Sequence, residues 1–442
     1  MANNCVITFD QNEYGTYFTG QLLTGKVVIT LNKPKKFKGI KLQINGYAQC
    51  QWRERHGRKR PIYKTNLKKR NIFYGHEDYI ASTTFLVGSE EGQSFAIDSG
   101  THTYTFSCPI PMNCPSSYEG AFGHIRYMVK VTFIRSGASN RTHTKGFTVL
   151  KLLDLNRESA LLKTPACNES LENFCLLPNS KAVHLRVDVT QTGYVPGQMI
   201  LVSSHVNNES SADVKKLLIT LNLRATYISD TPCMRTISEK LCLVKKYCGP
   251  VARHTTKDFA EIIRVPATPP SCDHLSKVVR LSYEICVKAI MNHFMRDPKT
   301  IIPITVGNVP LVTPNVETEP PSIDDVPTTS ACAMQRAEGD DHNLLSEETE
   351  VDYELPPPTY EEAMFMTTNI ADDDANTVSE NAQFTPRYPV YDVDNIVMSS
   401  AMAQSPPPNP PQKRRKRRKK NTSQPEMSSI EEKPPRESPV GI

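Results

Sequence analysis

Short apolar runs separated by polar turns recur throughout residues 1–306. Residues 40–45, Ile-Lys-Leu-Gln-Ile-Asn, alternate apolar and polar side chains, which is typical of a strand with one buried face. Similar runs, rich in Val, Ile, Thr, Tyr and Phe, predict strands at 26–31, 103–106, 125–134, 199–206 and 217–223. No long segment has the apolar spacing of an amphipathic helix. Many strands without crossover helices predict antiparallel β-sandwiches, because parallel strands need long crossover connections.

This pattern occurs twice, at an offset of 177 residues. The offset aligns Tyr17-x-x-Gly20-Gln21 with Tyr194-x-x-Gly197-Gln198, and the apolar pattern that follows also agrees. A second pair of similar strands, at 125–130 and 279–285, follows a proline-rich segment in both copies. The repeat predicts two homologous sandwiches in tandem, which we place at residues 1–153 and 154–306.

The composition changes after residue 306. The last 136 residues hold 19 of the 34 prolines and only 3 of the 20 glycines, and they contain no tryptophan. A segment of this kind buries too little apolar surface to offset the entropy lost on ordering. We therefore expect residues 307–442 to form a disordered tail.

The charge is also divided along the chain. Residues 1–306 carry 40 basic and 23 acidic side chains, whereas residues 307–412 carry 2 and 20. A basic body of this kind can attract an anionic membrane surface. Eight cationic residues then follow without interruption, and they have three interpretations: a nuclear import signal, a contact with anionic lipid, or a solvated counterweight to the acidic segment. The run consists of Lys413, Arg414, Arg415, Lys416, Arg417, Arg418, Lys419 and Lys420.

No catalytic motif is visible in the sequence. The segment from Gly20 to Lys26 resembles a phosphate-binding loop, but Val27 replaces the Ser or Thr that would bind magnesium. A β-patterned run follows where that loop would open a helix, so we interpret the segment as a turn that enters a strand. We expect no nucleic-acid partner, because the basic segments of the body contain no aromatic stacking platform or recognition motif for nucleic acid. We expect a protein that is not an enzyme and that needs no cofactor.

The twelve cysteines are scattered, and no pair has C-x-x-C spacing. The first residues lack a secretory signal, and no stretch reaches the roughly 18 unbroken apolar residues that span a bilayer. These features predict reduced thiols in a soluble, intracellular protein without a metal site.

Several segments of the body resemble one known family. They are Tyr17-x-x-Gly20-x-x-x-x-Gly25, Gly46-Tyr47-Ala48-x-x-x-Trp52, Gly100-x-His102-x-Tyr104-x-Phe106, Pro115 to Gly120, Ile125-Arg126-Tyr127, Asp154-Leu155-Asn156 and Tyr194 to Gln198. In this order and spacing they resemble the α-arrestins, the arrestin-domain-containing proteins, over about residues 5–306. The resemblance implies an all-β chain of two tandem arrestin-like, immunoglobulin-like sandwiches.

The tail contains one complete PPxY motif, formed by Pro357, Pro358 and Tyr360. Consecutive prolines preset a polyproline II helix, so little entropy remains to be lost when the peptide enters the aromatic groove of a WW domain. Farther on, Pro389-x-Tyr391 stands where α-arrestins commonly have a second PPxY, but Arg387-Tyr388 precedes it in place of a proline. We expect this second segment to bind WW domains weakly or not at all.

The resemblance implies an adaptor that joins membrane-protein cargo to a WW-domain, HECT-type ubiquitin ligase and promotes ubiquitination and endocytic trafficking. It also implies a cytoplasmic protein associated with the plasma membrane or endosomes, with a nuclear pool as a further expectation. A second hypothesis is a redox or nuclear signalling regulator similar to the thioredoxin-interacting branch of the family. That branch uses a cysteine of its second domain, and Cys248 lies in a comparable region.

Overall fold

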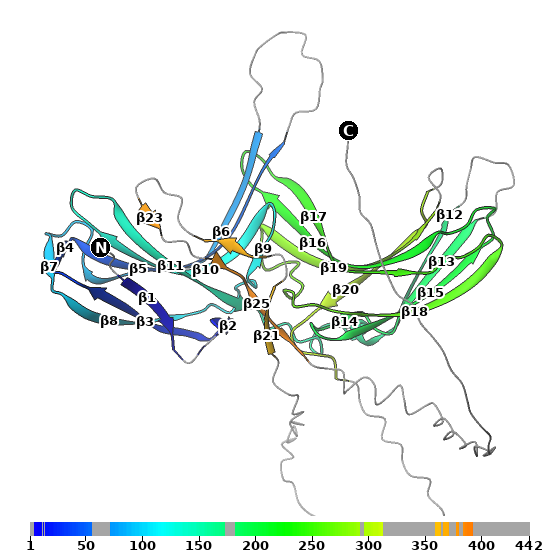
Figure 1. Cartoon of the computed structure of the whole chain (residues 1–442), viewed down its shortest axis with the longest axis horizontal. Coiled ribbons are helices and arrows are strands. Elements are labelled where there is room, and N and C mark those ends of the chain that lie inside the picture. The colour runs from blue at the N-terminus through cyan, green and yellow to red at the C-terminus, as the bar shows by residue number, and fades with distance from the viewer. Residues whose placement is uncertain are drawn as a thin grey trace, which may run out of the picture. The chain divides into compact units, whose positions relative to one another are not determined.

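The structure is a computed structural model, and it describes residues 4–10, 12, 14–54, 71–172, 182–291, 296–312, 359–363, 366–370, 377–379 and 383–391. Within these ranges the chain is almost entirely β-strand, as Figure 1 shows. The single helical element among them is a 3-10 turn, η1, at Ala160–Lys163. The all-β class predicted from the sequence is confirmed.

The first sandwich has two main sheets. One has the order β1-β3-β8, with β1 at Asn4–Phe9, β3 at Leu22–Leu31 and β8 at Gly100–Pro109. The other has the order β2-β11-β10-β5-β6, with β2 at Thr16–Phe18, β11 at Asn140–Leu150, β10 at Gly123–Ile134, β5 at Gly39–Glu54 and β6 at Asn71–Gly88. Short strands complete it: β4 at Lys35–Phe37 pairs with β7 at Phe95–Ile97, and β9 at Tyr118–Glu119 pairs with β10.

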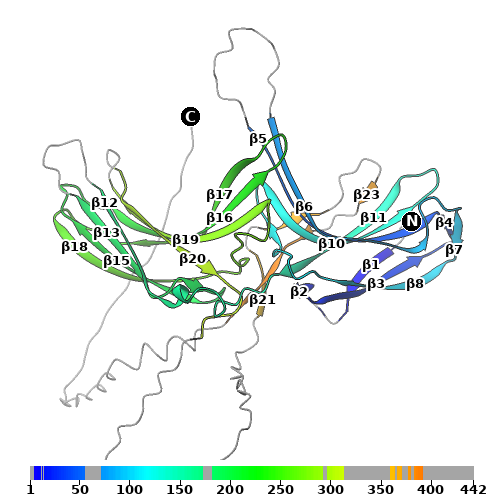
Figure 2. The same ribbon diagram turned by 180° about the vertical axis from the view of Figure 1, so that it is seen from behind.

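The second sandwich repeats this plan. One sheet has the order β12-β13-β15-β18, with β12 at Ala166–Glu172, β13 at Val183–Val189, β15 at Met199–Asn208 and β18 at Thr255–Arg264. The other has the order β14-β20-β19-β16-β17, with β14 at Gly193–Tyr194, β20 at Lys299–Val306, β19 at Val279–Ile290, β16 at Lys216–Ser229 and β17 at Arg235–Cys248. Figure 2 shows β16, β19 and β20 as neighbours in this second sheet.

The internal repeat is confirmed by these topologies and by matching local geometry. The short strands β2 and β14 both pair in parallel with the last long strand of their sheet. Gly20 and Gly197, which the repeat aligns, both have a left-handed φ, of 87° and 94°, that favours glycine. The side-chain oxygens of Gln21 and Gln198 each accept a hydrogen bond from the backbone N–H three residues earlier, at 2.8 and 3.2 Å. Each turn therefore opens its sandwich in the same way.

The predicted strands are present, and their burial follows the pattern that predicted them. Along β5, buried positions alternate with half-buried or exposed ones from Leu42 to Trp52, so one face of the sheet packs on the core. The turn at Gly20 and Gln21 leads directly into β3, as expected for a strand entry. Large residues such as Tyr127 and Tyr227 are fully buried within the cores.

Part of the region predicted as a disordered tail differs from that expectation. Residues 359–391 contain β21 (Thr359–Glu362), β22 (Thr368–Asn369), β23 (Thr377–Ser379), β24 (Gln383–Phe384) and β25 (Arg387–Val390). Local apolar side chains explain the difference, because Met366, Ile370, Tyr388 and Val390 are all buried. The composition averaged over the whole tail does not reveal this small apolar cluster, which packs against the sandwiches.

Candidate functional site

The strands described between residues 359 and 391 pair with one another and with the body. We call the described residues 359–363, 366–370, 377–379 and 383–391 the tail strap. Within it β21 pairs antiparallel with β25, and β22 pairs antiparallel with β24. The remaining strand, β23, pairs in parallel with β11 of the first sandwich. Figure 1 shows β21 and β25, drawn in orange, side by side. The strap therefore brings the tyrosine of the PPxY motif into contact with the folded domains.

Tyr388 is the most deeply buried anchor of the strap. Its side chain is fully buried, and its hydroxyl donates a hydrogen bond to the Ser117 carbonyl at 2.8 Å. The thioether of Met366, from the same strap, lies 3.8 Å from that hydroxyl. Just before it, the backbone N–H of Arg387 donates to the Thr148 hydroxyl at 3.1 Å. Ring burial and satisfied polar groups together fix this part of the strap on the first sandwich.

Tyr391 anchors the other end of this segment on the second sandwich. Its backbone N–H donates to the Pro196 carbonyl at 3.0 Å, and its hydroxyl donates to the Asn308 carbonyl. The Tyr391 backbone lies so close to Gly197 that a Cβ at this glycine would overlap the Tyr391 carbonyl oxygen. The five residues from Arg387 to Tyr391 therefore touch both sandwiches.

Tyr360 lies next to these anchors. It faces Pro389 in the β21–β25 register, and its ring stacks on that of Tyr14, with centroids 5.8 Å apart and planes inclined by 28°. The ring is partly buried against the core, and this burial raises the pKa of Tyr360. An ion pair between Arg387 and Glu362, with N and O 2.8 Å apart, closes the end of the strand pair. Tyr360 is therefore held by both backbone pairing and ring contact.

A second contact fixes the middle of the strap. Arg126 forms a bidentate pair with Glu119, at 2.6 and 2.8 Å, and its Nη2 also donates to the Thr368 hydroxyl at 3.0 Å. Close by, Phe384 packs on Gly146, where a Cβ would come within 2.6 Å of the ring. The surface below the strap is therefore shaped to receive it.

The same face of the molecule holds the contact between the two sandwiches. The hydroxyls of Tyr118 and Tyr227 lie 3.2 Å apart, and Tyr227 also donates to Glu239 at 2.8 Å. Asn308, which follows β20, donates a side-chain hydrogen bond to the carbonyl of Lys151, which follows β11, at 2.8 Å. Since Ser117 directly precedes Tyr118, the Tyr388 anchor lies beside this contact.

The residues singled out in the sequence fall partly within the described ranges. Tyr360 is described, whereas Pro357 and Pro358 lie outside the described residues. The basic run Lys413 to Lys420 also lies outside them. Sequence reasoning did not identify Tyr388 and Tyr391 as anchors. The signal that was available is their pairing of aromatic and proline residues, Tyr-Pro-Val-Tyr, within an otherwise acidic and polar tail.

Cys248 lacks the features of a reactive thiol. It lies at the end of β17 with 7% of its surface exposed. Burial, together with the nearby Glu261 carboxylate, raises the pKa of Cys248 to about 11. A thiol with this pKa is almost entirely protonated near neutral pH, and the thiolate is the nucleophile. Among the described cysteines, Cys167, Cys233 and Cys242 are exposed thiols.

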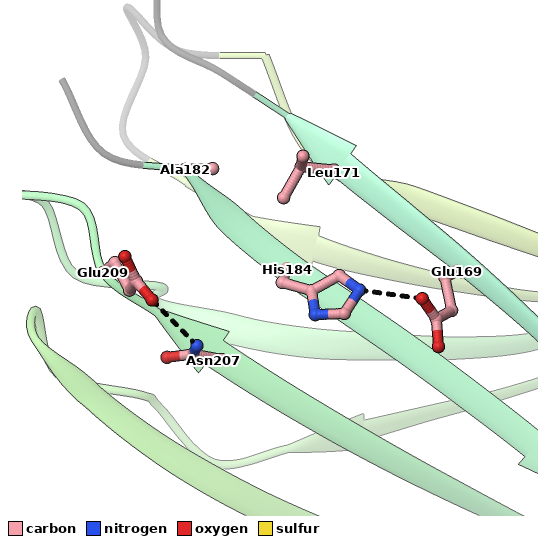
Figure 3. A pocket seen from close by; sticks show the side chains of 6 residues that line it. All are labelled: Glu169, Leu171, Ala182, His184, Asn207 and Glu209. Atoms are coloured by element: carbon pink, nitrogen blue, oxygen red, sulfur yellow. Dashed lines mark hydrogen bonds and ion pairs between the residues drawn. The ribbon is translucent and has the colours of Figure 1, made fainter. Parts of the chain in front are cut away.

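A surface hollow on the second sandwich offers no second candidate. Figure 3 shows its lining residues on β12, β13 and β15, with Ala182 just before β13 and Glu209 just after β15. His184 lies 3.1 Å from Glu169, and Asn207 donates to Glu209 at 3.2 Å, so these polar groups already contact one another. Within the described ranges, no three side chains of the metal-binding types gather into a site. None of the described helical segments has the length and hydropathy needed to cross a bilayer.

Comparison with known families agrees with the two-sandwich fold. Residues 5–156 match the family model of the arrestin (or S-antigen) N-terminal domain, and residues 179–311 match that of the arrestin (or S-antigen) C-terminal domain. The fold and these matches define a protein of the arrestin class, with both domains of the arrestin fold in one chain.

Curated relatives define the family more narrowly. Arrestin domain-containing protein 17 of Caenorhabditis elegans is 26% identical over 433 residues, covering 86% of this chain and 97% of its own. Arrestin domain-containing protein 5 of Homo sapiens is 22% identical over 304 residues, covering 66% and 84%. Arrestin domain-containing protein 1 of Rattus norvegicus is 24% identical over 302 residues, covering 66% and 62%. The chain belongs to the arrestin-domain-containing proteins, the α-arrestins. Proteins of this family are adaptors that bind other proteins, which supports the prediction of a non-enzymatic role.

Proposed function

We propose that this α-arrestin recruits a WW-domain, HECT-type ubiquitin ligase through Pro357, Pro358 and Tyr360. The arrestin domains bind membrane-protein cargo, and the recruited ligase ubiquitinates that cargo and directs it into endocytic trafficking. The observation that carries the proposal is a complete PPxY motif in the same chain as two arrestin domains. Three successive prolines precede Thr359 and Tyr360, and they preset the extended helix that a WW groove accepts.

The proposal places the protein in the cytoplasm and at the surface of the plasma membrane or endosomes. Residues 1–306 carry a net charge of +17, from 40 basic and 23 acidic side chains, which favours contact with an anionic leaflet. The run Lys413 to Lys420 supports either the same contact or import into a nuclear pool.

The redox alternative has less support. A mixed disulfide with thioredoxin needs an accessible thiol with a low pKa, whereas Cys248 is buried and burial raises its pKa to about 11. The adaptor function is therefore the one we propose.

Binding of tail peptides to isolated WW domains tests the ligase site. In a peptide of residues 350–395, Tyr360→Ala removes the aromatic anchor, a change that costs about 2 kcal/mol or more and weakens binding roughly thirtyfold. Tyr391→Ala in the same peptide is the matched control, and we expect little change because Arg387-Tyr388 lacks the paired prolines. Equal losses from the two substitutions, measured by calorimetric titration, would show that the ligase site lies elsewhere.

A further inference from the structure

We propose that the tail strap is an intramolecular clasp, seated in a peptide-binding site formed by both arrestin domains, that withholds Tyr360 from WW domains. The inference rests on the proposed function, because it assigns a regulation to the same PPxY motif. We call this site the seat. Its contacts come from Ser117, Thr148, Pro196, Gly197 and Asn308. Its ligand is an extended peptide with two anchoring tyrosines, here the chain's own residues 387–391.

The docked strap and a WW complex exclude one another at Tyr360. In a WW complex the PPxY tyrosine enters a pocket of the partner, and the preceding prolines lie in its groove. In the structure the Tyr360 ring stacks on Tyr14 instead, and its strand is paired with β25. Ala363, just beyond β21, extends this pairing, since its N–H donates to the Pro386 carbonyl at 2.9 Å. A WW domain therefore binds Tyr360 only after β21 separates from β25 and from the body.

The seat of β25 is specific in shape and in hydrogen bonding. The Tyr388 ring is fully enclosed and its hydroxyl is paired with Ser117. Tyr391 fits against Gly197, where no side chain has room, and its hydroxyl meets the Asn308 carbonyl. Burial of one tyrosine in the first sandwich and capture of another by the second require both domains. A non-specific contact would not bury the Tyr388 ring and also provide hydrogen-bond partners for both tyrosine hydroxyls.

β25 is therefore the template on which β21 is held. Seating of Tyr388 and Tyr391 fixes β25, and the fixed strand then pairs with Thr359 to Glu362. The Thr359 hydroxyl also donates to the Val390 carbonyl at 3.2 Å. When only a fraction of molecules has β21 released, the apparent affinity for a WW domain falls by that fraction. If β21 alone is paired with β25 nine-tenths of the time, while β25 stays docked, binding is weakened about tenfold.

The test compares the affinity of one isolated WW domain for a tail peptide and for the full chain. We expect a peptide of residues 350–366, which contains PPxY but not β25, to bind about tenfold more tightly than the wild-type full chain. Tyr391→Ala in the full chain unseats β25 and should restore the affinity to that of the peptide. Tyr14→Ala removes the stacking partner of Tyr360 from the body and should raise the affinity without altering the tail.

Tyr247→Ala is the matched control, because this half-exposed tyrosine of β17 lies against Lys216 and Lys245, outside the seat. If Tyr391→Ala does not fold, as judged by circular dichroism, Tyr14→Ala carries the test because Tyr14 is half exposed. Equal affinity of the peptide and the wild-type chain would overturn the clasp and leave the proposed function intact. The clasp would also be overturned if the wild-type chain binds the WW domain more weakly than the peptide and neither variant raises that affinity. A peptide that binds no WW domain would remove the proposed function and the clasp with it.

Discussion

Tyr388 provides the most direct test of how firmly the tail strap is seated. Its side chain is fully buried, and a tyrosine in that state removes roughly 150–250 Å² from water. At about 25 cal/mol per Å² this burial contributes on the order of 4–6 kcal/mol before the entropy of ordering is subtracted. Truncation of a buried aromatic residue to alanine typically costs about 3–5 kcal/mol. We therefore expect Tyr388→Ala to release the strap, because undocking avoids leaving a cavity of that size in the seat.

Native-state hydrogen exchange measures this release at individual amides. The N–H of Tyr391 donates to Pro196 at 3.0 Å and that of Arg387 donates to Thr148 at 3.1 Å, so both amides should be protected while the strap is docked. A loss of about 3–5 kcal/mol corresponds to exchange roughly a hundred to several thousand times faster, with the unprotected rate as the upper limit. The amide of Val129 in β10 is the internal reference and should keep its wild-type rate, since the sandwich core is unaltered.

Tyr388→Phe separates the hydroxyl from the ring. It keeps the buried ring and removes the hydrogen bond to the Ser117 carbonyl, a change that costs about 1 kcal/mol, or roughly fivefold in exchange. Docking of the strap through Tyr388 is refuted if Tyr388→Ala leaves the Tyr391 and Arg387 amides at their wild-type rates. It is also refuted if these amides are already unprotected in the wild-type chain.

Three further predictions concern other parts of the molecule. Burial, reinforced by Arg126 and His76, lowers the pKa of His124 from 6.5 to about 3, so the folded state should lose stability as pH falls from about 6.5 towards 3. The free energy of unfolding then changes with pH by at most ~1.4 kcal/mol per pH unit, and denaturant titrations of His124→Gln should show a smaller change. Cys248 should be alkylated by iodoacetamide at pH 7 more than tenfold more slowly than the exposed Cys233, as mass spectrometry will show, and comparable rates would restore the redox hypothesis. Replacing Lys413 to Lys420 by glutamine should change where the protein resides in cells but leave its affinity for a WW domain unaltered; an unchanged distribution would favour the counterweight interpretation.

The sandwiches were predictable because their information is local and repeated. A strand with one buried face imposes a period of two on its sequence, as β5 does from Leu42 to Trp52. The matched turns at Gly20 and Gly197 need a positive φ, which favours glycine, so these glycines are recognisable in the sequence alone. Two copies of such a pattern reinforce one another, and the tandem arrangement follows.

The seat of the strap could not be predicted because none of its parts is local. Tyr388 meets Ser117 across 271 positions of sequence, and Tyr391 meets Asn308 across 83. A seat of this kind exists only after both sandwiches have folded, and it leaves no periodicity in the tail. The tail composition gave the opposite indication, because a few anchoring side chains are diluted by many prolines and acidic residues. The number of anchors needed to dock a strap is much smaller than the number needed to build an independent core.

The features that disqualify residues 387–391 as a WW ligand are the ones that fit them to the seat. A PPxY motif would place proline at 388, and the motif that ends at Tyr360 also has proline, Pro356, at the position that corresponds to 387. Proline has no backbone N–H. Arg387 uses its N–H to reach Thr148 and its guanidinium to pair with Glu362, and neither contact is available to proline. Tyr388 fills the pocket beside Ser117, which a pyrrolidine ring would leave largely empty. The tail thus holds two peptides of related composition with different chemistry. The first peptide, Pro357-Pro358-x-Tyr360, is suited to a groove that binds paired prolines. The second, Arg387-Tyr388-Pro389-x-Tyr391, is suited to a seat that binds two tyrosines and accepts a hydrogen bond from a backbone N–H.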